Sequence, residues 1–160
     1  MFREIRKKRN KLSLEKTKQL LHNERRGILA VNGDEDEGYP YALPVNYYYD
    51  ETNNKIYFHG AKVGHKVDAL KTNDKICFTV YGHETIKEEK WAPYVQSAIL
   101  FGRCHLLEYN DQTMDKLKKF AMKYYPDEKM VDDEIKAIGK AVQIYEITIE
   151  HLSGKEVQEK

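Results

Sequence analysis

Hydrophobic and polar residues alternate at every second position over most of this chain, and they follow a helical spacing in only a few segments. Alternation is typical of half-buried β-strands, whereas spacings of three and four residues are typical of amphipathic helices. The alternating segments predict six strands, over residues 25–33, 39–51, 55–59, 74–82, 95–109 and 141–152. Turn signals such as Asn32-Gly33 separate several of them.

Helical spacing predicts four shorter helices, over residues 14–24, 65–73, 112–125 and 132–140. Ser13 precedes the first and is a good N-cap, Asp111 is the expected cap of the third, and Pro126 ends it. Residues 83–94 are polar, contain a proline and predict a long loop, and residues 153–160 predict an irregular tail.

Because turns rather than long helices separate most strands, the strands are expected to pair antiparallel and to close into a small barrel. The helices then pack on its outside and ends. A length of 160 residues predicts a single domain over residues 1–160, large enough to bury a complete core. The alternating βαβ pattern of a doubly wound sheet is absent, as is a dinucleotide-binding glycine fingerprint.

Composition narrows the class of partner. The chain has 27 basic and 26 acidic residues, a net charge of +1, which argues against nucleic acid as a partner. No apolar run approaches the length of a membrane span, and the basic segment 1–11 is not followed by the apolar core of a secretory signal. We therefore expect a cytoplasmic protein whose residues 1–11 form a mobile or partner-draped arm. The two cysteines, Cys77 and Cys104, are expected to be reduced.

The stretch "HGAKVGHK", residues 59–66, joins a predicted strand to a predicted helix and is the most informative loop. Glycines at Gly60 and Gly64 allow positive φ and a close approach of the backbone to a ligand. A helix that begins near His65 offers N–H groups and partial positive charge to a phosphate, and Lys66 and a protonated His65 add cations. The loop predicts one anion site. It does not match a Walker loop, since Val67 stands where a magnesium-binding hydroxyl is required.

The residues alone leave structural explanations open beside the functional ones. The loop is equally well explained as a strand-to-helix turn with solubilising lysines. Three roles remain open for His59: a loop residue that hydrogen-bonds a ligand, a proton donor, or a ligand to haem or a metal. Trp91 is either a cover for a cofactor or a hydrophobic anchor for its loop. No histidine and cysteine spacing of the zinc type is present, so we expect no metal site. Ser97 has no recognisable base, which argues against a serine hydrolase.

Taken together, the segments "YPYALPVNYYYDETNNKIYFHGAKVGHKVDAL", "CFTVYG", "SAILFGRCHLLE" and "LSGKE" resemble the FMN-binding split-barrel proteins. These are relatives of pyridoxamine 5′-phosphate oxidase, and the likeness is greatest to the branch of nitroimidazole-resistance (Nim-type) proteins. It extends over residues 24–155. The resemblance implies a mainly β fold, an antiparallel Greek-key split β-barrel with peripheral helices, and a homodimer with FMN at the subunit interface.

Carried over residue by residue, the resemblance implies a cofactor site with four parts. The isoalloxazine ring and ribityl chain would contact Leu43, Pro44, Val45 and Asn46. The ribityl-phosphate would be flanked by His59, Gly60 and Ala61. The phosphate would be held by His65 and Lys66 after Gly64. A hydroxyl bond near the flavin would come from Ser97.

The arginine-rich substrate segments of the true oxidase are missing, so pyridoxamine phosphate is not the expected substrate. His65 occupies a position that is often arginine or lysine, which predicts weaker flavin retention at alkaline pH. We expect an FMN-dependent oxidoreductase of a small molecule, such as a nitroaromatic reductase, with no identifiable catalytic acid or base. The alternatives are FAD or haem as the cofactor, and a binding protein without turnover.

Overall fold

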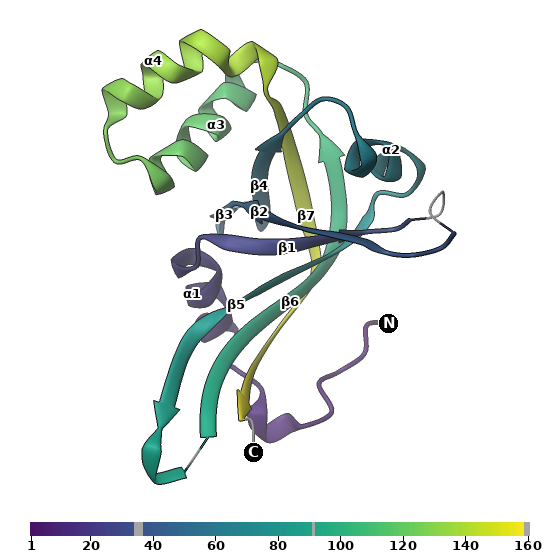
Figure 1. Cartoon of the computed structure of the whole chain (residues 1–160), viewed down its shortest axis with the longest axis vertical. Helices are drawn as coiled ribbons and strands as arrows, with labels where there is room; N and C mark the ends of the chain where they lie inside the picture. The colour runs from purple at the N-terminus through teal and green to yellow at the C-terminus, as the bar shows by residue number, and fades with distance from the viewer. Residues whose placement is uncertain (34–36, 91, 159–160) are drawn as a thin grey trace.

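The computed structural model describes residues 1–33, 37–90 and 92–158, and shows one curled antiparallel sheet with helices at its ends (Figure 1). Trp91 and part of the acidic turn at 34–38 lie outside the described residues. The strands are β1 Arg26–Val31, β2 Tyr41–Asn46, β3 Tyr48–Asp50, β4 Lys55–Gly60, β5 Lys75–Lys87, β6 Ala92–Leu106 and β7 Gln143–Gln158. The helices are α1 Leu14–Asn23, α2 His65–Thr72, α3 Asp111–Tyr124 and α4 Glu128–Ile138, with short 3-10 turns at Lys8–Asn10, Glu88–Lys90 and Gly139–Ala141.

The strands form a single sheet in the order β2-β1-β5-β6-β7-β4-β3, and all of its pairings are antiparallel. The sheet curls so that β2, at one end of this order, also contacts β4 near the other end. This arrangement is a split barrel and confirms the predicted fold class. The predicted strand over 39–51 is divided in two at Tyr47, whose buried hydroxyl donates to the Leu21 carbonyl oxygen.

Two predictions at the ends of strands were wrong. The polar stretch 83–94 is not a loop, because β5 and β6 continue through most of it as a hairpin that pairs up to Lys87 and Ala92. The tail after residue 152 is not irregular, because β7 pairs with β6 as far as Gln158. Figure 1 shows these three strands extending well beyond the barrel.

The barrel interior holds the larger of two hydrophobic clusters. Leu20 and Leu21 of α1 enter it at one end, and α1 contacts β5, β6 and β7. Ser13 caps this helix as predicted, accepting from the Lys16 N–H. The third helix is capped by Asn110 instead of the expected Asp111, one residue earlier.

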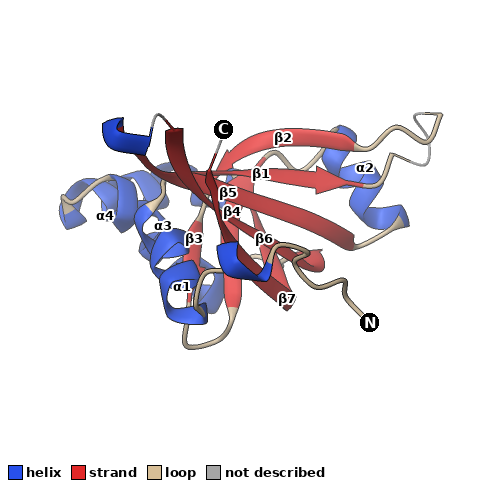
Figure 2. Cartoon of the chain, turned by 90° about the horizontal axis from the view of Figure 1, so that it is seen from below, coloured by secondary structure: helices blue, strands red, loops and turns tan. Residues whose placement is uncertain are grey.

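The second cluster joins α3 to the outer face of the sheet. Tyr57 of β4 and Ile144 of β7 pack there against Leu117 and Phe120 of α3. Helix α4 begins earlier than predicted, because Asp127 accepts from the Met130 N–H and caps it. Figure 2 shows α3 and α4 side by side, at the opposite side of the sheet from α2.

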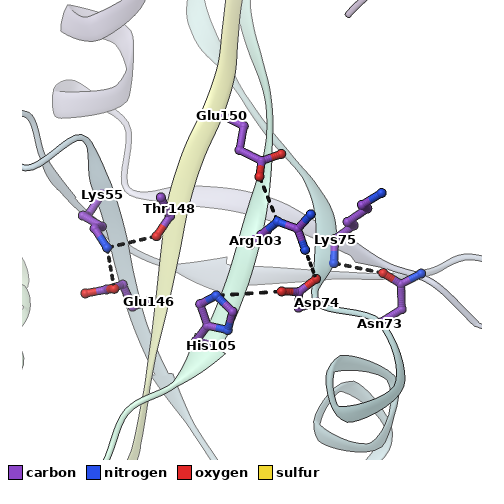
Figure 3. A network of polar contacts seen from close by, with 9 residues as sticks. All are labelled: Lys55, Asn73, Asp74, Lys75, Arg103, His105, Glu146, Thr148 and Glu150. Atoms are coloured by element: carbon purple, nitrogen blue, oxygen red, sulfur yellow. Dashed lines mark hydrogen bonds and ion pairs between the residues drawn. The ribbon is translucent and has the colours of Figure 1, made fainter. Parts of the chain in front are cut away.

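Ion pairs connect neighbouring strands of the sheet. Arg103 of β6 donates to Asp74 at 2.7 Å and to Glu150 of β7 at 2.9 Å (Figure 3). Lys55, at the start of β4, donates to Glu146 of β7 at 2.6 Å. Glu146 is partly desolvated, which opposes its ionisation, but bonds from Lys55 and Tyr57 lower its pKa overall. The register of β4 against β7 is therefore fixed by charge as well as by the ladder.

The N-terminal segment, residues 1–12, packs against the sheet of its own chain. The Phe2 ring stacks on Phe101 at 5.6 Å and on His151 at 4.8 Å, and Lys11 forms a bridge with Lys155. No helix in the described part of the chain is long and apolar enough to cross a membrane.

Candidate functional site: the corner between β4 and α2

The corner between β4 and α2 is shaped by Gly64, the N-cap of α2. Its φ of 119° and ψ of 177° are accessible almost only to glycine. The Gly64 carbonyl accepts from the N–H groups of Val67 and Asp68, and no side chain of the described residues caps the first turn. The prediction of a helix beginning at His65 is confirmed. The amide groups at the start of a helix are a suitable seat for an anion.

The structure gives Gly60 a different role from the one predicted. Among glycines of the described residues only Gly38 and Gly64 have positive φ, so Gly60 does not supply a left-handed turn. A Cβ at Gly60 would lie 3.0 Å from the Lys66 Nζ atom and 3.2 Å from its Cε atom. The glycine therefore leaves room for the lysine side chain to lie across the end of β4.

Lys66 is the most informative side chain of the corner. Its ammonium lies 5.2 Å from the centre of the Tyr145 ring, and the Tyr145 hydroxyl donates to the Ala61 carbonyl at 2.5 Å. Burial, with a smaller effect from Cys104, raises the pKa of Tyr145 to about 12, so this hydroxyl keeps its proton. Within residues 1–33, 37–90 and 92–158, Lys66 forms no ion pair. A half-buried cation without a carboxylate partner suits an incoming anion.

His65 connects this corner to β2. Its ring stacks on that of Tyr41, the first residue of β2, at 3.9 Å and 25°. Along β2 the exposure alternates, so that Leu43 and Val45 pack toward the barrel while Pro44 and Asn46 face outward. Because β2 is the last strand in the sheet order, its outer edge has no strand partner in the described chain. The predicted ring-binding stretch thus offers an open backbone edge close to the predicted phosphate loop.

His59 and Gly60 lie on opposite faces of β4. The His59 ring turns toward α3 and meets the Phe120 ring edge-on at 4.9 Å, whereas Gly60 faces Lys66. Desolvation lowers the pKa of His59. Of the residues predicted to flank the phosphate, His59 therefore contributes its backbone at this corner and its ring elsewhere.

Ser97 is far from the corner in the same chain. It pairs with Lys155, and its Oγ donates to the Lys155 carbonyl at 3.5 Å. The residue of β6 that pairs with Tyr145 is Leu106, nine positions along the strand, which corresponds to about 30 Å. The structure does not bring Ser97 together with Lys66 within one molecule.

Tyr41 and Tyr145 are the site residues that sequence reasoning missed. In the sequence, the only sign of them was that the chain has 12 tyrosines, which is more than usual. The available signal was strand alternation, which puts Tyr145 on the barrel side of β7 with Phe58 opposite it, their rings stacked at 4.6 Å. Among the described residues, no group of three or more His, Cys, Asp and Glu side chains is placed to hold a metal.

The residues at this corner fit the phosphate of FMN, the cofactor that the resemblance implies. A phosphate would meet the first-turn amides of α2 and the Lys66 ammonium, and the open edge of β2 lies nearby. The corner does not present the His59 ring as a haem ligand, because that ring turns away from it.

A family model described as pyridoxamine 5′-phosphate oxidase matches residues 13–156. Among curated proteins, none matches the chain significantly.

Three solved structures illustrate the likeness of fold. A candidate 5-nitroimidazole antibiotic resistance protein from Bacteroides thetaiotaomicron has a TM-score of 0.76 and 17% identity, over 92% of this chain and 87% of that one. A FAD-binding protein from Mesorhizobium loti has a TM-score of 0.65 and 22% identity, over 92% and 96%. A FAD- and haem-binding protein from Mycobacterium smegmatis has a TM-score of 0.70 and 18% identity, over 89% and 70%.

Proposed function

The chain belongs to the pyridoxamine 5′-phosphate oxidase family, and on that premise we propose that it is an FMN-dependent oxidoreductase of a small molecule. The cofactor phosphate binds at the corner between β4 and α2. Lys66 carries the proposal, because its half-buried ammonium lies over Gly60 without a carboxylate partner among the described residues. The backbone N–H of Lys66, in the first turn of α2, completes the anion site.

Flavin supplies hydride and electron transfer by itself, so the protein has to bind, orient and shield it. Lys66 and the first turn of α2 bind the phosphate end. The outer edge of β2, from Leu43 to Asn46, offers backbone groups to the polar rim of the isoalloxazine ring. The stacked pair of Tyr41 and His65 joins these two parts and shields the approach to the phosphate from one side.

A homodimer with the flavin at the interface accounts for the exposed apolar face of the sheet. Ile99 and Phe101 of β6 are 39% and 38% exposed, and Tyr81 of β5 is 63% exposed. Pro44 of β2 is exposed as well. Large apolar side chains grouped on neighbouring strands are typical of a surface that another protein covers. A second copy would also bring its own Ser97 toward a flavin that this chain's Ser97 does not reach.

The substrate we propose is a nitroaromatic or a similarly reducible small molecule, in keeping with the likeness of fold to the Bacteroides protein. In this proposal the reduction relies on the flavin itself and on protons from solvent. A second candidate function is that of a flavin- or haem-binding protein without turnover. The solved FAD- and haem-binding protein shows that this fold holds such groups.

The first experiment is to purify the protein, record its absorption spectrum and determine the mass of the released chromophore. A flavin spectrum and the mass of FMN support the proposal. FAD keeps the anion site but changes the cofactor, and a Soret band favours haem. Anaerobic mixing with NADH or NADPH, followed by a nitroaromatic, then separates an enzyme from a binding protein.

Lys66→Ala tests the anion site itself. Loss of one charge-assisted bond should weaken flavin binding about tenfold, or about 1.4 kcal/mol. Lys71→Ala is the matched control, because Lys71 lies on the same helix with 68% of its side chain exposed. The measurement is a fluorescence titration of apoprotein with FMN. Equal affinities for the two variants would show that the phosphate binds elsewhere.

A further inference from the structure

The packing of α3 against α4 leaves an open cavity of about 430 Å³ on the far side of β4 from Lys66. Its volume lies within the range of about 300–1,000 Å³ that is usual for small-molecule sites. Helix α3 supplies Leu117, Phe120 and Ala121, while α4 supplies a wall that includes Val131 and Ile135. His59 closes the cavity from β4.

The rim of this cavity is apolar, although solvent reaches it. Tyr125, Met130 and Ile138 line it with 63%, 64% and 48% of their surface exposed. Exposed large apolar side chains that converge on one concave surface are costly in water, and burial of that surface by a ligand would be favourable.

Among the described lining residues, His59 is the polar one that comes from a strand of the sheet. Among the residues that the structure describes, no group hydrogen-bonds its ring nitrogens, and its only ring contact is the edge-on one with Phe120. Desolvation lowers its pKa, so at neutral pH the ring is uncharged and offers one donor and one acceptor. His59 is exposed, so a ligand in the cavity can reach its ring nitrogens and hydrogen-bond to them.

The charges around the cavity select the ligand class. Its described lining contains no lysine or arginine and has a single carboxylate, that of Glu134. An anion would be repelled there, and a flavin phosphate would have no cation to meet. A cation would lose its hydration against an apolar wall. The lining therefore suits an uncharged molecule, and the Phe120 ring suits an aromatic one.

We propose that the cavity between α3 and α4 is a binding site for an uncharged aromatic small molecule, which packs against Phe120 and hydrogen-bonds to His59. This site is separate from the flavin corner and does not depend on it, because β4 turns His59 and Gly60 to opposite faces. The family comparison assigns nothing to it.

The test uses 2-naphthol as the probe and naphthalene as its partner without a hydrogen-bonding group. The purified protein, with whatever cofactor it carries, should bind 2-naphthol saturably with one site per chain, as measured by calorimetry. Ala121→Phe fills the cavity and should weaken binding at least tenfold. Ala137→Phe makes the same change at an exposed position of α4 outside the lining, and should leave binding unchanged. Binding unaffected by Ala121→Phe overturns the proposal.

His59→Phe separates the hydrogen bond from the apolar cavity. The wild-type protein should prefer 2-naphthol over naphthalene by about three- to tenfold, as one net hydrogen bond allows. His59→Phe should abolish this preference while naphthalene still binds. A preference that survives the substitution refutes the role of His59.

Two further readouts distinguish this cavity from the flavin corner and from an interface between copies of the chain. Flavin content should be the same in wild type and Ala121→Phe, whereas Lys66→Ala should lose flavin and keep 2-naphthol binding. The mass in solution, measured by light scattering, should not differ between Ala121→Phe and Ala137→Phe. A change of oligomeric state in Ala121→Phe alone would assign the cavity to a second copy of the chain and overturn the proposal.

Discussion

Gly64→Ala is the substitution that tests the shape of the corner most directly. The φ of 119° and ψ of 177° at Gly64 are strongly unfavourable for alanine, at a cost of about 1–3 kcal/mol. A Cβ built there meets no atom within 4 Å, so the cost comes from the backbone alone. For a chain of this length each kcal/mol lowers the melting temperature by about 2–4 °C. If the exposed loop relaxes instead, the first turn of α2 moves and the anion site is lost.

The assay is thermal unfolding together with flavin content for Gly64→Ala and Gly60→Ala. The second variant has an ordinary backbone conformation, and its added Cβ displaces only the flexible end of Lys66. We expect it to change stability by less than about 0.5 kcal/mol and yet to retain less flavin. A Gly64→Ala protein with the melting temperature and the flavin content of wild type would refute the requirement for this turn geometry.

Two further predictions concern the C-terminal turn of α3. Burial, with a smaller effect from Arg25, lowers the pKa of Lys123 from 10.5 to about 8. Between these pH values the unfolded chain therefore binds more protons than the folded chain. The stability of wild type relative to Lys123→Met should accordingly increase as pH rises from 8 to 10. A stability difference, from urea unfolding, that stays constant over this range would contradict the shift. The Tyr124 hydroxyl accepts from the Tyr47 N–H at 2.8 Å, and Tyr124→Phe should cost about 1–3 kcal/mol by leaving that donor unpaired. An unchanged urea midpoint with an unchanged m value would contradict this account.

The strand pattern of the barrel could be predicted because each strand has one face in the core. Where both faces are exposed the pattern fails. Ile86 is 73% exposed, and its neighbours in the outer half of β5 are polar, so residues 83–94 predict a loop. The hairpin exists because β6 satisfies the backbone groups of β5, a pairing that alternation does not reveal. The end of β7 fails for a different reason: it is partly buried, and its pairing with β6 and the packing of Gly154 against Thr17 of α1 involve residues far away in the sequence.

The candidate site, too, could be predicted from the sequence only in part. The loop from Gly60 to Lys66 could be identified because glycine, a helix start and a cation occur within a few consecutive residues. Tyr145 could not be assigned to it, because 79 positions separate it from Lys66 and only the register of β4 against β7 brings them together. Ser97 was grouped with the loop by resemblance, and the length of β6 places it far away within one chain.

By itself the sequence determined the local features of this protein: the strand and helix periods, the capped start of α1, and the strand-to-helix turn at Gly64. These depend on neighbouring residues and on backbone conformation, which sequence encodes directly. Tertiary structure alone decided that the His59 ring faces α3 while Gly60 faces Lys66, and that an apolar cavity opens between α3 and α4. Both depend on which elements pack on each face of β4, and that packing is set by contacts between residues far apart in the chain.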